Sequence, residues 1–350
     1  MTSMPDGAYF AVVGRITAGA GGQTRMMLLR HRLFAEHLGI DVPILTYNPA
    51  ANYDPIRESL DDDGLLLPQS RVLNLYEDLR GRDLDGLASV AVADEPAYVR
   101  EGTCLDYLDD DGVPWRRRWT TPSGIPWFEY LRTDGTVFAR TRADGWAGTT
   151  QICASDGHAF GSWPTRGGLW RWWTTQLAPA TGHVFLVSDS RRAAQSLFSI
   201  QDPRFFVLHQ MHNPHTVGRR HWTSDIGATY RDSMDRLGRL DALSCLTHRQ
   251  RDDVARRFGA TDNLVVIPNP VEIPDEPQPP PVRHPGRLVI IARLDKQKRL
   301  DRAIAAFALL VVSHPYARLD IYGEGSERQA LEQQIDKAGL TKYVTLHGHD

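Results

Sequence analysis

The sequence has little of what marks several common protein classes. Only three cysteines occur, with no C-x-x-C pair among them, so neither a disulfide framework nor a cysteine zinc site is indicated. No run approaches the roughly 20 apolar residues of a membrane-spanning helix, and the first residues lack the pattern of a signal peptide. The formal net charge of -3 gives no overall attraction to nucleic acid or anionic membrane. We therefore expect a cytoplasmic protein with no membrane span and no nucleic-acid partner.

Lysine is also scarce, because only four of the 40 basic residues are lysines. Two of the four, Lys296 and Lys298, lie close together in one short segment. At 350 residues the chain is long enough for two domains with separate cores. A hydrophobic fraction of 41% is typical of a globular protein.

The segment around these lysines carries the clearest functional signal. The apolar run 288–292 predicts a buried strand, and the spacing after Leu300 predicts a helix. Arg293 and Lys298 lie between the two, where open α/β sheets bind ligands. A phosphate could be bound here by the arginine fork, the mobile lysine ammonium group and the backbone N–H groups at the helix start. The alternative is a basic surface loop that caps the helix.

A second strand, 317–322, leads into Gly323 and Gly325, which allow close backbone approach. Ser326 and Gln329 form the pattern of a capping box, so we expect the next helix to begin there. A third strand, 344–348, completes a doubly wound strand–helix–strand–helix–strand unit.

These blocks resemble the C-terminal nucleotide-sugar domain of retaining GT-B glycosyltransferases of family 4. The rest of the chain looks closest to the bacterial teichoic-acid and poly(glycerol-phosphate) α-glucosyltransferases and the adhesin-modifying N-acetylglucosaminyltransferases. The segments that carry the resemblance are Ala292-Arg293-Leu294, Lys298-Arg299-Leu300-Asp301, Tyr322-Gly323-Glu324-Gly325, Leu346-His347-Gly348, Gly21-Gly22-Gln23-Thr24 with Arg30 and Phe34, 208–212, 246–250 and 267–270.

The resemblance implies an α/β protein of two Rossmann-like domains. It also implies transfer of a hexose, glucose or N-acetylglucosamine, from a UDP-sugar to a hydroxyl, with retention and with no cofactor or metal. The acceptor would be a cell-wall polyol-phosphate polymer or a protein Ser/Thr. Arg293 and Lys298 would be catalytic, by stabilising charge on the departing diphosphate. The donor-binding residues implied in this domain are Gly323, Gly325, His347 and Gly348.

Near the N-terminus, a strand at 9–13 is followed by a glycine-rich loop and a helix at 24–37. The loop has neither the P-loop ending nor the dinucleotide fingerprint. The resemblance places Gly21 and Gly22 beside the donor. Alternatively, these glycines only turn a tight corner.

Three histidines, His209, His212 and His215, lie at and after the strand 205–209. No glutamate completes a zincin pattern, which disfavours zinc. The resemblance implies that His209 is catalytic by orienting the donor sugar, with His212 as the next candidate in the donor site. A structural loop histidine is the alternative.

Between about 70 and 165 the helical signals fade, and Asp-Gly or Ser-Gly pairs recur, which predicts β-hairpins. Exposed edges of such an insertion favour a homo-oligomer. Eight prolines at 268–285 predict a domain boundary. The predicted domains are therefore an N-terminal acceptor domain at 1–275, a linker at 276–285 and the first half of a nucleotide domain at 286–350.

Two further features have competing interpretations. The acidic triplets 61–63 and 109–111 each adjoin a glycine, which favours solvated turns over a metal site. Tryptophans cluster just before the strand 183–188, where packing is favoured over sugar stacking. The clustered residues are Trp163, Trp170, Trp172 and Trp173.

The family's paired glutamates, eight residues apart, do not occur before Asp350. We therefore expect the sequence to lack part of the donor site, which leaves the activity of this form open. A catalytically inactive GT-B partner and a UDP-sugar epimerase remain alternatives. A nicotinamide-dependent enzyme is disfavoured, because no G-x-G-x-x-G fingerprint with an acidic partner is present.

Overall fold

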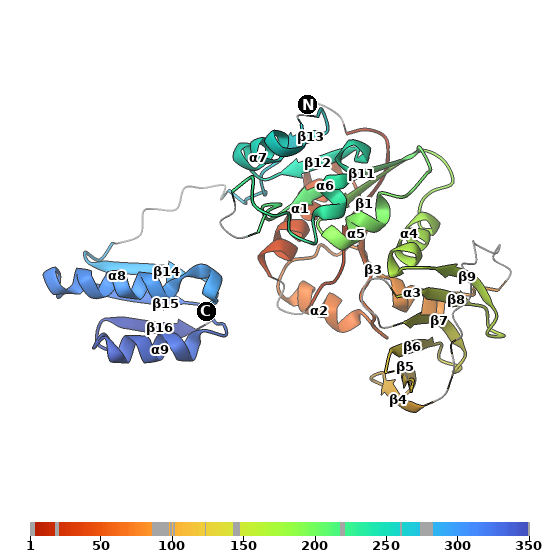
Figure 1. The fold of residues 1–350 in the computed structure, drawn as a ribbon, viewed down its shortest axis with the longest axis horizontal. Helices are drawn as coiled ribbons and strands as arrows, with labels where there is room; N and C mark the ends of the chain where they lie inside the picture. Colours follow the sequence, from red (N-terminus) through yellow and green to blue (C-terminus); the bar gives the residue numbers. More distant parts are fainter. Residues whose placement is uncertain are drawn as a thin grey trace. The chain divides into compact units, whose positions relative to one another are not determined.

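The structure is a computed structural model that describes residues 4–17, 21–85, 98, 100, 102–122, 124–142, 148–217, 221–259, 261–273 and 283–348. The chain forms two compact units, Met1–Val271 and Glu272–Asp350 (Figure 1). Most of the predicted linker, residues 276–282, lies outside the described residues. None of the described helices has the length and hydrophobicity that a membrane crossing requires.

The N-terminal unit is built on a seven-stranded parallel sheet in the order β13-β12-β11-β10-β1-β2-β3. Its strands are short apolar runs that are buried on both faces, as parallel sheets require. Every strand points the same way, so their carboxyl ends share one edge. The strands are β1 (Gly7–Val13), β2 (Ile44–Thr46), β3 (Val72–Asn74), β10 (His183–Ser188), β11 (Phe205–Met211), β12 (Ala242–Cys245) and β13 (Leu264–Val266).

Helices connect these strands, and several begin at a polar cap. Thr247 accepts a hydrogen bond from the Gln250 backbone N–H at 3.1 Å and so caps the start of α7. The first helix ends at Leu38, and its C-cap Gly39 takes a φ of 65°, a left-handed conformation that favours glycine. The helices are α1 (Gly22–Leu38), α2 (Asp54–Asp62), α3 (Leu75–Gly81), α4 (Arg166–Gln176), α5 (Arg191–Leu197), α6 (Arg231–Asp235), α7 (His248–Phe258) and the 3-10 turn η2 (Leu237–Arg239).

A six-stranded antiparallel sheet, β4 to β9 in sequence order, lies between α3 and α4 in the chain. The predicted hairpins are confirmed where they are described: the glycines of four turns have φ between 77° and 83°. The Asp144-Gly145 pair lies outside the described residues. The strands are β4 (Thr103–Leu108), β5 (Pro114–Thr120), β6 (Pro126–Leu131), β7 (Val137–Arg142), β8 (Thr150–Cys153) and β9 (Ala159–Trp163), and the turn glycines are Gly112, Gly124, Gly135 and Gly157.

The predicted start of the β-rich segment near residue 70 is wrong. Residues 72–81 form β3 and α3, and β3 pairs with β2 in the parallel sheet. The buried residues Leu75, Tyr76 and Leu79 hold α3 in the main core. The short apolar strand β3 therefore extends the Rossmann-like sheet before the hairpins begin.

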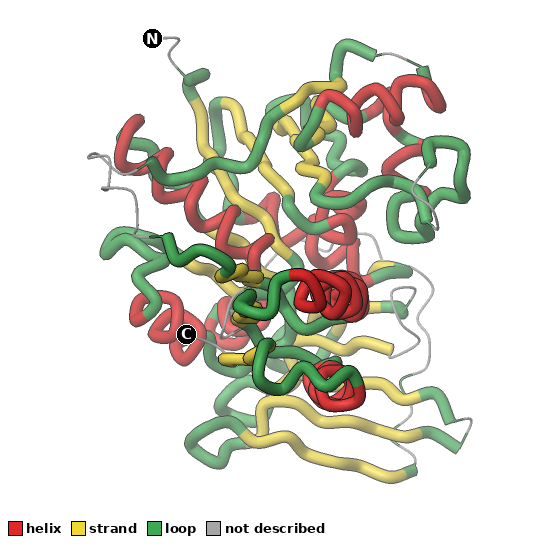
Figure 2. The backbone as a smooth tube through the Cα atoms, turned by 90° about the vertical axis from the view of Figure 1, so that its left-hand side faces the viewer, coloured by secondary structure: helices red, strands yellow, loops and turns green. Residues whose placement is uncertain are grey.

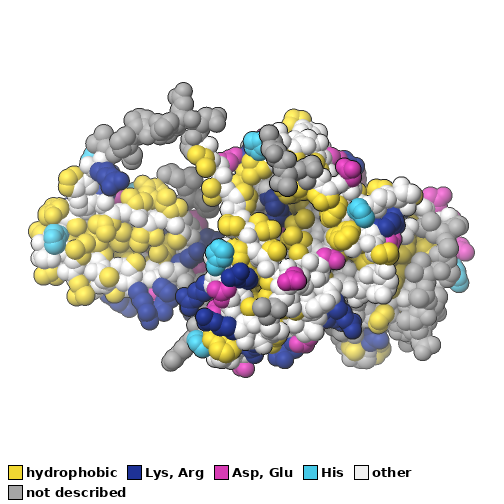
Figure 3. Space-filling view, turned by 90° about the horizontal axis from the view of Figure 1, so that it is seen from above, with side chains coloured by type: hydrophobic (Ala, Val, Ile, Leu, Met, Phe, Trp, Pro, Cys, Tyr) yellow, Lys and Arg dark blue, Asp and Glu magenta, His cyan; other side chains and the backbone are white. Residues whose placement is uncertain are grey.

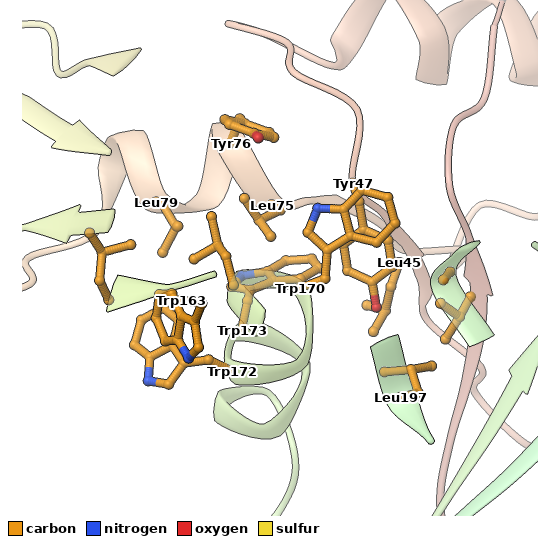
Figure 4. Close-up of a cluster of buried hydrophobic side chains, with 14 of the residues drawn as sticks. Leu45, Tyr47, Leu75, Tyr76, Leu79, Trp163, Trp170, Trp172, Trp173 and Leu197 are labelled. Atoms are coloured by element: carbon orange, nitrogen blue, oxygen red, sulfur yellow. The ribbon is translucent and has the colours of Figure 1, made fainter. Parts of the chain in front are cut away.

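The clustered tryptophans pack in the core that joins α4 to the antiparallel sheet, as predicted (Figure 4). Trp173 is fully buried and donates its indole N–H to Asp78 at 2.7 Å. The Trp170 ring stacks on Tyr47 with a centroid distance of 4.5 Å. Four large aromatic rings therefore fix the antiparallel sheet to the parallel one.

The C-terminal unit has a three-stranded parallel sheet in the order β14-β15-β16. Helices α8 and α9 lie on the same face of this sheet (Figure 2). Their apolar positions, including Ile304 and Leu331, form one core with Ile321 of the central strand. The elements are β14 (Arg287–Ile291), η3 (Lys296–Lys298), α8 (Leu300–Ser313), β15 (Arg318–Tyr322), α9 (Arg328–Lys337) and β16 (Val344–Gly348).

Two predictions fail in this unit. The first strand, β14, is not buried, because it is an edge strand and the helices cover only one face; Ile291 is 83% exposed. Hydrophobic side chains are accordingly visible on the surface of this unit (Figure 3). The predicted cap at Ser326 is also wrong. Helix α9 begins at Arg328, after Glu327, and no side chain caps it.

Candidate functional site

In the C-terminal unit, the predicted cations lie on the loop that follows β14. Arg293 has a 71% exposed side chain and contacts Asp295 at 3.2 Å. Lys298 is exposed and forms no ion pair with the described residues. Arg299 then takes a left-handed backbone conformation, φ 55°, immediately before α8. The loop therefore presents Arg293 and Lys298 to solvent at the carboxyl end of the sheet, where an anion has access to them.

Gly323 and Gly325 hold the loop after β15 against the loop after β14. A Cβ at Gly323 would lie 2.1 Å from the Ala292 carbonyl oxygen, and one at Gly325 would lie 2.5 Å from that of Leu294. The backbone N–H of Leu294 donates to the Glu324 carbonyl at 2.9 Å. These two glycines therefore permit close contact between two loops of the chain itself.

His347 and Gly348 end the third strand. His347 Nε2 contacts Asp320 Oδ1 at 2.7 Å, and its ring stacks on Tyr322 with a centroid distance of 4.4 Å. The Gly323 N–H donates to the Gly348 carbonyl at 2.6 Å. The ends of all three strands therefore meet, although the imidazole of His347 is held against the sheet.

In the N-terminal unit, the carboxyl edge is organised around Asp189, the first residue after β10. Its side chain is buried and contacts His212 Nε2 at 2.8 Å. Arg30 from α1 forms a two-pronged ion pair with the same carboxylate. The Asp189 carbonyl accepts a hydrogen bond from Gln23, which ties it to the start of α1.

Burial alone would raise the pKa of the Asp189 carboxyl. The positive charge of Arg30 and the hydrogen bonds from His212 and Arg30 outweigh burial and lower the pKa below its ordinary value. Asp189 is therefore ionised at neutral pH and accepts the hydrogen bond, so His212 Nε2 carries a proton.

Gly21 and Gly22 begin α1 in ordinary backbone conformations. Gly21 is the N-cap, with φ -71° and ψ 169°, and a Cβ at either glycine would meet nothing within 4 Å of the described residues. No described neighbour therefore requires glycine at these two positions. Through Gln23 and Asp189, this helix start belongs to the same cluster as His212.

His209 is not at the end of its strand, as the sequence suggested, because β11 continues to Met211. Its side chain has no solvent exposure, and Nδ1 contacts the Ser188 carbonyl at 3.2 Å. Burial lowers the pKa of His209 to about 4. The described structure therefore presents His209 as a neutral core histidine and His212 as the histidine at the carboxyl edge.

Cavities lie beside both groups of residues. One of about 480 Å³ in the N-terminal unit includes Gly14, Gln23 and Asp189 in its wall. A second, of about 370 Å³, is lined by His212, His215 and Gln250 among others. In the C-terminal unit, a cavity of about 400 Å³ adjoins Lys296 and Arg299.

The acidic triplets do not converge on a common site. Asp63 pairs with Arg25 at 3.0 Å, and Asp109 pairs with Arg80 at 2.7 Å. Within the described ranges, no three His, Cys, Asp or Glu side chains lie close enough together to hold a metal ion.

Sequence comparison connects this geometry to known proteins. Residues 275–350 match the family described as glycosyl transferases group 1. The chain is 28% identical over 170 residues to the poly(glycerol-phosphate) alpha-glucosyltransferase of Bacillus subtilis, covering 47% of this chain and 24% of that protein. It is 37% identical over 67 residues to the GtfA subunit of a Streptococcus gordonii peptide N-acetylglucosaminyltransferase, covering 19% of this chain and 13% of that protein. The alignments thus span at most about a quarter of these relatives.

Solved structures extend the likeness to nearly the whole chain. Staphylococcus aureus TarM, in complex with fondaparinux, alpha-GlcNAc-glycerol and UDP, matches with a TM-score of 0.78 and 17% identity over 99% of this chain and 78% of its own. The fold is GT-B. The pneumococcal O-GlcNAc transferase GtfA, in complex with UDP and GlcNAc, matches this GT-B chain with a TM-score of 0.62 and 15% identity, over 98% of this chain and 76% of its own. The resemblance and the fold class predicted from the sequence are confirmed.

Asp189 was not among the residues predicted from the sequence, although it is central to the cluster at the carboxyl edge of the N-terminal GT-B unit. A signal was present: it is the charged residue directly after the apolar strand 183–188. The strand order, which was not known from sequence, makes β10 and β11 neighbours and so brings Asp189 to His212.

Proposed function

We propose that the protein is a retaining glycosyltransferase that moves a hexose, glucose or N-acetylglucosamine, from a UDP-sugar to a hydroxyl acceptor. The observation that carries the proposal is the exposed Arg293 and Lys298 on the loop after β14, inside the segment that matches glycosyl transferases group 1. Two of the matched relatives are named as transferases of glucose and of N-acetylglucosamine, which supports a hexosyl donor.

In this proposal, Arg293 and Lys298 bind the diphosphate and stabilise the charge that develops on it as the sugar departs. Preorganised cations are among the strongest catalytic groups for a charged leaving group. They supply the positive charge that a divalent metal would otherwise provide. The neighbouring loops are held together by the close backbone contacts at Gly323, Gly325 and Gly348.

The N-terminal unit provides the remaining groups of the proposed mechanism. His212 is the histidine that hydrogen-bonds a sugar hydroxyl. Its ring is at the carboxyl edge, and the contact of Nε2 with Asp189 holds the ring in place. His209 then supports this edge by packing in the core, and it is not the sugar ligand that was first expected. Gly21 and Gly22 leave space at the start of α1 for a ligand to approach the backbone.

The proposal includes self-association through the β-rich insertion. Strand β4 is an edge of its sheet, and most of its residues are exposed, including Leu105 and Leu108. An exposed edge strand offers unpaired backbone groups to a second copy. Sedimentation of the purified chain tests this, and a monomer at all concentrations would contradict it.

The proposed reaction is tested by incubating the chain with UDP-glucose or UDP-N-acetylglucosamine and a glycerol-phosphate oligomer or a Ser/Thr peptide. We expect UDP release that depends on the acceptor, and an α-linked product by proton NMR. UDP-sugar binding with no transfer to any acceptor would favour the inactive-partner alternative. Interconversion of the sugar without acceptor would favour an epimerase.

A further inference from the structure

The two ring nitrogens of His212 have different surroundings. Nε2 contacts Asp189 Oδ1 at 2.8 Å, whereas Nδ1 has no hydrogen-bond partner among the described residues. The side chain is 10% exposed, and His212 lines the cavity of about 370 Å³ in the N-terminal unit. One nitrogen is therefore held by the protein, and the other is left for a ligand.

The partner of Nε2 determines where the imidazole carries its proton. The Asp189 carboxylate is buried, and Arg30 forms a two-pronged ion pair with it. An ionised carboxylate only accepts hydrogen bonds, so the Nε2 of His212 must be the donor. A neutral imidazole with its proton on Nε2 has a free lone pair on Nδ1, which makes Nδ1 a hydrogen-bond acceptor.

The loop that carries His212 is held by contacts that do not use Nδ1. Gln250 of α7 donates from its Nε2 to the Asn213 carbonyl at 2.9 Å. The Oε1 of the same amide accepts a hydrogen bond from the Leu246 backbone N–H at 2.7 Å. Gln250 therefore joins the loop after β11 to the end of β12, and the position of the imidazole does not depend on a ligand.

We infer that Asp189 is a positioning residue that determines specificity: it fixes the proton of His212 on Nε2, so that Nδ1 accepts a hydrogen bond from a ligand group that donates one. The inference rests on the proposed function, in which His212 contacts a hydroxyl of the sugar. It adds the direction of that hydrogen bond. A hydroxyl can donate to Nδ1, whereas a fluorine or an ether oxygen at the same carbon cannot.

Nitrogen NMR of the whole chain tests the tautomer without any ligand. In the ¹⁵N-labelled wild type at pH 8, the ring nitrogens of His212 are the signals that are missing from His212→Leu. Their couplings to the carbon-bound ring protons distinguish the two tautomers. We expect a proton on Nε2 and none on Nδ1. A proton on Nδ1 of the wild type would overturn the inference, and this outcome can be read without any Asp189 variant.

Asp189→Asn should move the proton from Nε2 toward Nδ1. Arg30 donates to the carboxylate, so the amide oxygen of the variant should face Arg30 and its N–H group should face His212. Asp63→Asn is the matched control, because Asp63 pairs with Arg25 on the surface and should leave the His212 signals unchanged. An unchanged tautomer in folded Asp189→Asn would show that Asp189 does not set it.

Donor analogues test the direction of the hydrogen bond. In a set of UDP-glucose analogues, one sugar hydroxyl at a time is replaced by hydrogen or by fluorine, which cannot donate. At the hydroxyl that contacts His212, both analogues should bind about three- to tenfold more weakly than UDP-glucose, because each loses one neutral hydrogen bond. In His212→Leu both penalties should disappear at that position. The inference is overturned if no position depends on His212, or if the fluorine analogue there binds as tightly as UDP-glucose.

The two measurements separate this inference from the proposed function. If no UDP-sugar binds, the proposed function fails, while the spectrum of the free chain still decides whether Asp189 sets the tautomer of His212. If UDP-sugars bind and are transferred but His212 carries its proton on Nδ1, the inference is wrong and the proposed function stands.

Discussion

The carboxylate of Asp189 accepts a hydrogen bond from His212 Nε2 at 2.8 Å, and each of the two residues is the first after its strand. Strands β10 and β11 are parallel neighbours, with Ser188 opposite His209, so their carboxyl ends bring the two side chains together. Arg30 completes the cluster from α1. The pair therefore follows from the strand order of the sheet.

Removing the charge of Asp189 should destabilise the N-terminal unit. Asp189→Asn leaves Arg30, whose side chain is only 17% exposed, without its anion. Breaking such a buried pair costs about 3 kcal/mol of unfolding free energy or more. Asp63→Asn, which breaks an exposed pair with Arg25, should cost less than about 1 kcal/mol. Urea unfolding followed by tryptophan fluorescence measures both, since all nine tryptophans precede residue 271. Equal losses would show that the Asp189 pair is not a buried one.

The neutral His209 should make stability fall in mild acid. Burial lowers its pKa to about 4, whereas the unfolded chain takes up the proton near pH 6.5. The unfolded state thus binds more protons between these values, so the unfolding free energy falls as the pH drops from 6.5 toward 4. For His209 alone the loss between pH 8 and pH 5 is roughly 2 kcal/mol.

His209→Phe isolates this contribution, because burial also lowers the pKa of His31 and His215 and both add to the wild-type slope. The variant should lose about 2 kcal/mol less than wild type between pH 8 and pH 5. Unfolding at pH 8 is the internal reference, because histidine is neutral there in both states. The same pH slope in both proteins would mean that His209 is reachable by solvent.

One glycine in each unit should respond differently to replacement by alanine. Gly323→Ala forces a Cβ toward the Ala292 carbonyl at a φ of 134°, which should cost roughly 2 to 4 kcal/mol. Gly22→Ala adds a Cβ in open space, so stability should change by less than about 0.5 kcal/mol. Hydrogen exchange of amides in β15 and β1 measures each unit separately. A stable Gly323→Ala would remove the steric reason for glycine there.

Much of the architecture could be predicted from local signals. Apolar runs identified the strands, and glycine pairs identified the hairpins, because both depend on a few neighbouring residues. The position of Arg293 and Lys298 between a strand and a helix could be predicted for the same reason, because β14 and α8 are adjacent in sequence.

The features that could not be predicted from the sequence depend on contacts between segments that are distant in the chain. Neither the burial of His209 nor its distance from the strand end follows from the apolar run around it. The importance of Asp189 depends on the order of β10 and β11 in the sheet and on Arg30, which is 159 positions away. The exposure of β14 reflects which sheet face the helices cover, which periodicity alone does not specify.

Calorimetric titration of UDP into the chain in the presence of EDTA tests the central claim most directly. We expect binding without added metal. Arg293→Gln and Lys298→Gln should each cost about 1.5 to 3 kcal/mol, or at least tenfold in affinity, because each loses a charged partner of the diphosphate. Lys337→Gln, the same charge change on the exposed end of α9, should have no effect. Unchanged affinity in both loop variants, or binding that appears only with Mn²⁺ or Mg²⁺, would contradict the account.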